Sequence, residues 1–156
     1  MKFFIFLLMF FPATCLASTL NDMHNNPLNY LTAGSLNREV SLYIDKNSIS
    51  IQKSAPNYII AFTEIAYIVP INAKNPSEIS AQTYLRRYKF NLNEQKMYQE
   101  IGNDWQEIIP SNTTLTAKGE IIFCLAFNKT FFNEPLSIYL QFYLKNGRWL
   151  TFAGRD

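Results

Sequence analysis

Apolar and polar residues alternate along much of this chain, which is the pattern of β-strands with one buried face. Residues 40–45 and 49–53 both show it, and a cluster of turn-forming residues at 45–47 lies between them. The sequence therefore predicts a hairpin of two short strands. Residues 58–69 are apolar on both faces and rich in β-branched and aromatic side chains, which favours a central strand.

Three further strands are expected in the middle of the chain. Alternation returns at residues 84–92, continues at 96–101 after a turn, and is found again at 105–109, where Pro110 ends the strand. The short turns between these segments predict that they follow one another as antiparallel neighbours.

Residues 111–127 fit two patterns. One is a helix with an apolar face, for which Ser111 or Thr113 is available as the N-cap. The other is a strand, because the apolar residues of 121–127 also alternate. The pattern alone leaves both open.

The C-terminal segment predicts a second hairpin. Residues 138–144 alternate as a strand does, and Asn146-Gly147 is typical of a two-residue hairpin turn. We expect the returning strand at 148–152.

The first residues of the chain are typical of a secretory signal peptide. An apolar run at 3–11 is followed by a small residue, Ala17, after which we expect cleavage. A transmembrane anchor needs about 20 apolar residues, and this run is shorter. We therefore expect a signal peptide at 1–17, a flexible leader at 18–37 and one domain at 38–156. A short helix or an edge strand is the alternative for the leader.

The charge composition limits the kinds of molecule that this protein is expected to bind. Fourteen basic and twelve acidic residues give the full chain a net charge of +2. A nucleic acid or an anionic membrane would require a dense basic face, so neither is expected as a partner. The signal peptide predicts export, to the periplasm or to the outer cell surface.

Cys124 is the one cysteine outside the predicted signal peptide, and it lies in an apolar run at 121–127. One interpretation is a buried side chain that acts as a small hydrophobe. The other is a disulfide between two molecules. In both cases Cys124 has no partner within the mature chain.

Residues for catalysis or metal binding are sparse. His24 is the only histidine and lies in the predicted leader, so neither a catalytic triad nor a metal site is expected. The five glycines form no phosphate-binding loop. Glu64, inside an apolar strand, is the one candidate acid for catalysis, and the alternative is a carboxylate at a sheet edge or in an ion pair. We expect no enzyme and no cofactor.

Tyrosine and arginine alternate along the strand at 84–92, and these residue types are common anchors of protein interfaces. Tyr84, Arg86 and Tyr88 share one face, and Arg87 lies on the other. The four residues are our candidate binding surface. The alternative is an ordinary set of cross-strand pairs.

Several segments together resemble the surface-adhesin protein E-like domain family of Gram-negative bacteria. They are VSLYIDKNSISIQ, YLRRYKFNLNEQKMY, DWQEIIPSN and the later Cys124, over about residues 39–125. The resemblance implies an α+β fold, an antiparallel sheet of about six to eight strands in a hairpin meander with one helix on a face. It therefore favours the helix at 111–127. In the family, a cysteine in the strand that corresponds to residues 88–92 bonds the later cysteine, whereas this sequence has Phe90 and Asn91 there.

The resemblance also implies a function, that of an exported, non-enzymatic binding protein. Its partners would be host or extracellular-matrix proteins, or a second copy in a homodimer. The alternative is a periplasmic module that binds a small apolar ligand or a partner protein, which the strands that are apolar on both faces suggest.

Overall fold

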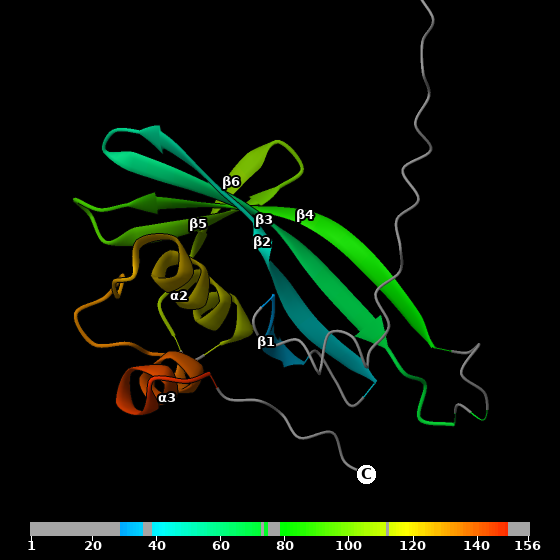
Figure 1. Ribbon diagram of the computed structural model, residues 1–156. Coiled ribbons are helices and arrows are strands. Elements are labelled where there is room, and N and C mark those ends of the chain that lie inside the picture. The colour runs from blue at the N-terminus through cyan, green and yellow to red at the C-terminus, as the bar shows by residue number, and fades with distance from the viewer. Residues whose placement is uncertain (1–28, 36–38, 73, 75–78, 112, 150–156) are drawn as a thin grey trace, which may run out of the picture.

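The computed structural model describes residues 29–35, 39–72, 74, 79–111 and 113–149. Within these residues it contains one six-stranded sheet and two helices, both on the same side of the sheet (Figure 1). The α+β class and the antiparallel meander are confirmed, with two helices where one was expected. The predicted signal peptide, most of the leader and the end of the predicted C-terminal hairpin lie outside the described residues.

Each strand pairs antiparallel with the strand that precedes it, so the spatial order is the chain order. The strands are β1 (Tyr30–Ser35), β2 (Val40–Ser54), β3 (Asn57–Ile68), β4 (Ser80–Asn91), β5 (Lys96–Ile101) and β6 (Asp104–Ile108). The predicted strands that became β3 to β6 are therefore close to their observed positions.

The hairpin predicted around residues 45–47 is wrong, because β2 runs through that position as one strand with a bulge. Hydrogen bonds within β2 and to β3 satisfy the polar groups of the bulge. The Asn47 N–H donates to Asp45 Oδ1 at 3.0 Å. The Ser48 hydroxyl donates to the Asp45 carbonyl at 2.7 Å and accepts the Thr63 N–H at 2.7 Å. These turn-forming residues bend the strand without reversing it.

Strand β1 lies within the predicted leader. It pairs with β2, and its Leu31 and Ala33 side chains are buried in the core. The edge-strand alternative therefore holds for residues 30–35.

Helix α2 (Thr114–Phe127) settles the ambiguous segment in favour of helix. The Thr113 side chain caps its start by accepting the Thr116 N–H at 3.4 Å. The helix ends at Asn128, which adopts a left-handed φ of 52°.

Helix α3 (Ile138–Asn146) replaces the hairpin that we predicted at Asn146-Gly147, so that prediction is wrong. Ser137 caps its start, and Gly147 ends it with a φ of 68°. A glycine with positive φ serves a helix C-terminus as well as a hairpin turn, so the motif did not distinguish them. Leu140 is the helix residue that is fully buried.

The core lies between the sheet and α2 and is rich in aromatic side chains. The Phe90 ring, for example, has its centroid 5.2 Å from that of Phe123 and 5.3 Å from that of Phe131. Helix α2 approaches the sheet closely at Gly119, where a Cβ atom would lie only 2.5 Å from Met97 Sδ. Glycine at this position therefore permits the observed spacing.

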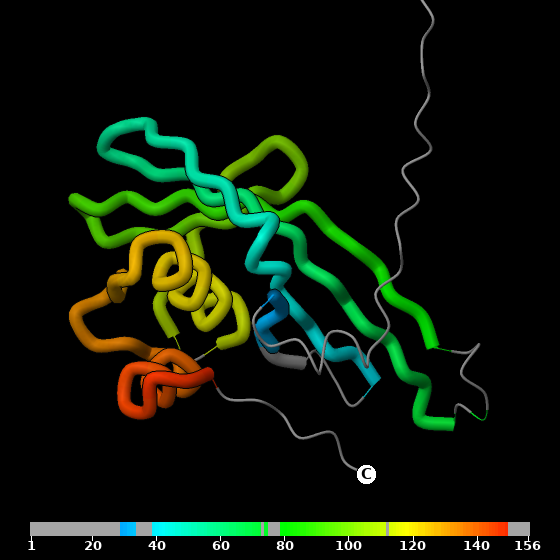
Figure 2. The backbone as a smooth tube through the Cα atoms, in the orientation of Figure 1, coloured from blue at the N-terminus to red at the C-terminus, as the bar shows by residue number. Residues whose placement is uncertain are grey.

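The sheet is not covered evenly. Figure 2 shows both helices beneath the end of the sheet that holds β5 and β6, while β3 and β4 continue past them to the other side of the view. We call the part of the sheet that packs against α2 the covered end. We call Ser80–Arg87 of β4, which pair with β3 but not with β5, the open edge.

Candidate functional site

All four predicted binding residues lie on β4, but they do not form one surface. Tyr88 is fully buried in the core, with a relative exposure of 0%, so it cannot contact a partner as expected. Burial, and to a lesser degree the charge of Glu64, raises the pKa of Tyr88, so its hydroxyl stays neutral. The hydroxyl has no hydrogen-bond partner among the described residues.

Arg86 faces the helix side of the sheet and binds Glu64. Its Nε atom lies 3.0 Å from Glu64 Oε1, and Lys118 Nζ from α2 lies 2.5 Å from Glu64 Oε2. The ion-pair interpretation of Glu64 is therefore confirmed. Two cations share one buried carboxylate, and the Arg86 side chain keeps 34% of its surface exposed. No pattern in the sequence points to Lys118, because its partner Glu64 lies on a strand far away in the chain.

Tyr84 is the exposed neighbour of Arg86 on the same face. The Arg86 guanidinium carbon lies 4.8 Å from the centroid of the Tyr84 ring, within the range of a cation–π contact. The Tyr84 hydroxyl donates a hydrogen bond to Gln82, also on β4. Both side chains lie on the open edge.

Arg87 belongs to a different group, on the outer face that neither helix covers. We call Arg87, Lys89, Tyr98 and Trp105 the outer cluster. The strand register brings it together, since Lys89 lies opposite Tyr98 and Glu100 lies opposite Trp105.

Cation–π contacts and an ion pair hold the outer cluster. Lys89 Nζ lies 4.3 Å from the Tyr98 ring centroid and 5.0 Å from that of Trp105. The Arg87 guanidinium carbon is 5.6 Å from the Trp105 centroid, and Arg87 Nη1 binds Glu100 Oε1 at 2.5 Å. All four side chains are half-buried, so each keeps surface that a partner could contact. The sequence prediction missed Tyr98 and Trp105.

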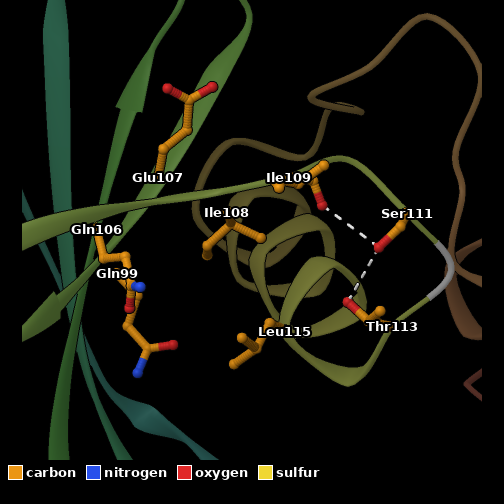
Figure 3. Close-up of a pocket in the computed structure, with 8 residues that line it drawn as sticks. All are labelled: Gln99, Gln106, Glu107, Ile108, Ile109, Ser111, Thr113 and Leu115. Atoms are coloured by element: carbon orange, nitrogen blue, oxygen red, sulfur yellow. Dashed lines mark hydrogen bonds between the residues drawn. The ribbon is translucent and has the colours of Figure 1, made fainter.

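A hollow of about 260 Å³ lies beside β6 and the start of α2 (Figure 3). Gln99 and Gln106 form a cross-strand pair on one side of it, and Leu115 of α2 lies across from them. The full lining comprises Gln99, Gln106, Glu107, Ile108, Ile109, Ser111, Thr113 and Leu115. This volume lies below the several hundred Å³ that are typical of small-molecule sites.

Glu120 is a second buried carboxylate, and it joins the two helices. It accepts the backbone N–H groups of Leu136 at 2.8 Å and Ser137 at 2.6 Å, immediately before α3. Burial raises the pKa of Glu120, and the two hydrogen bonds oppose that shift. Its contacts are those of a structural residue.

The remaining candidate chemistry is limited. Cys124 is free and buried beneath the sheet, as the first interpretation expected, and burial raises the pKa of its thiol. The described residues contain no group of three or more side chains of the types that commonly bind metal ions. Neither helix in the described part of the chain has the length and apolar character that crossing a membrane requires. His24 lies outside the described residues.

Comparison with protein-family models, with curated proteins and with solved structures finds no match to this chain. The resemblance to the surface-adhesin protein E-like domains therefore stays a prediction.

Proposed function

We propose that this chain is an exported, non-enzymatic binding protein whose partner is another protein. The observation that supports the proposal most is the outer cluster. Tryptophan, tyrosine and arginine are the residues most often found as energetic anchors of interfaces. Here they lie side by side on a sheet face that neither helix covers.

The resemblance supplies the class of partner, namely host or extracellular-matrix proteins. The alternative, a periplasmic module for a small apolar ligand, has less support. Of two hollows in the described structure, the one beside β6 is about 260 Å³, below the several hundred Å³ that are typical of small-molecule sites. The second, about 170 Å³, lies near Tyr58 and Phe127.

Two measurements test the proposal. Cell fractionation with protease treatment of intact cells locates the protein, and purified laminin, fibronectin and collagen serve as binding probes. We expect surface exposure and binding to at least one probe, which Trp105→Ala weakens about tenfold or more. Ile51→Ala, an exposed residue on β2, is the matched control and should bind as the wild type does. Confinement to the periplasm without binding to any probe would refute the proposal.

A further inference from the structure

The open edge of β4 presents unpaired backbone groups. Every residue of β4 lies opposite a residue of β3, from Ile68↔Ser80 to Asn57↔Asn91. On the other side, β5 pairs only with residues 88–91. Alternate N–H and C=O groups of Ser80–Arg87 therefore point away from β3 with no strand paired to them in the described structure, and only the Arg87 side chain, at the end of the edge, reaches Glu100 on β5. This edge is longer than an average strand of about five or six residues.

The edge also lacks the usual protection against strand addition. Proteins often interrupt an exposed edge with a proline, a charged side chain or a bulge. Residues 80–85 contain neither a proline nor a charged residue, and the pairing of 80–87 with β3 shows no shift of register; Arg86 and Arg87 stand only at the end of the edge. Leu85 projects from the edge with 73% of its surface exposed. The edge is thus a regular template that also offers apolar contact area.

Positive charge exceeds negative charge on both faces at the end of this edge. On the helix side, Arg86 and Lys118 share the single carboxylate of Glu64. On the outer side, Arg87 and Lys89 lie with the single carboxylate of Glu100. Successive side chains of a strand added here would lie on opposite faces of the sheet. They would therefore lie alternately beside the excess positive charge of the helix side and that of the outer side.

We propose that the open edge binds an extended acidic segment of the partner protein by strand addition. Backbone hydrogen bonds would supply affinity, and acidic side chains would supply specificity. A second copy of this chain is disfavoured as the occupant, because it would bring the same excess of positive charge. The inference rests on the proposed function, since it describes how a protein partner is held.

Synthetic peptides about eight residues long, alternating glutamate with valine, are the probes, and fluorescence anisotropy is the measurement. We expect the wild-type protein to bind this peptide at least about tenfold more tightly than a peptide with lysine in place of glutamate. Binding should weaken as the salt concentration rises. Two further peptides carry N-methyl groups, one on alternate residues and the other on every residue. The first keeps one edge of free N–H groups and should bind, whereas the second has no free edge and should lose binding.

Leu85 is a suitable position for a matched pair of variants, because its side chain is largely exposed and can be replaced by a side chain of either charge. Leu85→Glu should weaken binding of the acidic peptide about tenfold, whereas Leu85→Lys should bind it at least as tightly as the wild type. Ile51→Glu, on β2, should leave binding unchanged. Thermal unfolding of each variant confirms that the fold is retained.

Several outcomes would overturn the inference. They are equal binding of the acidic and lysine peptides, equal binding of the two methylated peptides, and no binding of any peptide. A concentration-dependent dimer that Leu85→Glu dissociates would show that a second copy occupies the edge. If binding to a matrix probe depends on Trp105 but not on Leu85, strand addition is rejected and the proposed function is retained. If the wild-type protein binds no matrix probe and no peptide, the proposed function is rejected as well.

Discussion

The two parts of strand β4 differ in what lies beside them. Residues 88–91 pair on both sides, and Tyr88 and Phe90 are fully buried beneath α2. The open edge, residues 80–87, pairs on one side and carries exposed or half-buried side chains. The alternation at residues 84–92, which predicts the strand, extends across both parts. The neighbours of the strand determine which residues become core and which remain available.

This difference separates stability from binding. The covered end should determine whether the protein folds, and the open edge and outer cluster should determine what it contacts. Substitutions in matched pairs, one in each region, can test that separation.

The largest expected effect is that of Phe90→Ala at the covered end. Removing a buried phenylalanine ring costs about 3–5 kcal/mol, and this ring packs against both Phe123 and Phe131. Leu85→Ala, on the open edge, should change the free energy of unfolding by no more than about 0.5 kcal/mol. Urea unfolding measures both. Similar losses for the two variants would contradict the division of β4 into two parts.

The next largest effect is expected for ion pairs, which should contribute differently to stability on the two faces of the sheet. Glu64→Gln removes the carboxylate that Lys118 binds, and the Lys118 side chain is only 7% exposed. We expect a loss of about 3 kcal/mol, because a buried charge is left without its partner. Glu100→Gln breaks the pair with Arg87 on the outer face, where solvent screens it, and should cost about 1 kcal/mol or less. A larger cost for Glu100→Gln would show that the outer face is the more important for stability.

Glu120 predicts a pH dependence that belongs to the covered end. Because its pKa is raised above the ordinary 4.5, the folded protein holds this proton at pH values where the unfolded chain has lost it. Its contribution is therefore fully present below the unfolded pKa and is lost as the pH rises through the folded pKa.

The measurement is the free energy of unfolding of the wild type minus that of Glu120→Gln, taken from acidic to neutral pH. This difference should fall as the pH rises. The exposed Glu134→Gln serves as the control for the loss of one negative charge. A difference that increases with pH would mean that the hydrogen bonds to Leu136 and Ser137 outweigh burial.

The smallest effect is expected for Tyr88→Phe. The hydroxyl of Tyr88 has no hydrogen-bond partner among the described residues, so its removal relieves a buried polar group. The variant should be as stable as the wild type, or more stable by up to about 1 kcal/mol. Its binding should be unchanged, since Tyr88 lies in the core. A loss of stability in thermal unfolding would show that the hydroxyl is bonded in solution.

Much of the fold could be predicted from local pattern. Strand β3 follows from its run of β-branched and aromatic residues, and β4 to β6 follow from alternation and from the turns between them. The errors occurred where one local motif serves two structures. Turn-forming residues at 45–47 made a bulge because β3 continues alongside β2, and Asn146-Gly147 ended a helix because Ser137 and Glu120 fix the start of that helix.

The candidate site was harder to predict because it depends on register. Arg86 and Arg87 were found from residue type, yet Tyr88 was assigned to the surface although α2 covers it. Trp105 and Tyr98 were missed, although counting residues back from the turn between β4 and β5 places Lys89 opposite Tyr98. Contacts between distant segments, such as Lys118 with Glu64, have no signal in a single sequence.

The strands lie in the sheet in the same order as in the chain, and this order also affects how the molecule folds. Each strand can pair with the one made just before it, so the sheet can grow by closing short loops, at low entropic cost. The packing of α2 against β1 is different, because it joins segments near the two ends of the described chain. That step requires most of the domain to be present. We therefore expect the sheet to form early and the docking of α2 to complete folding.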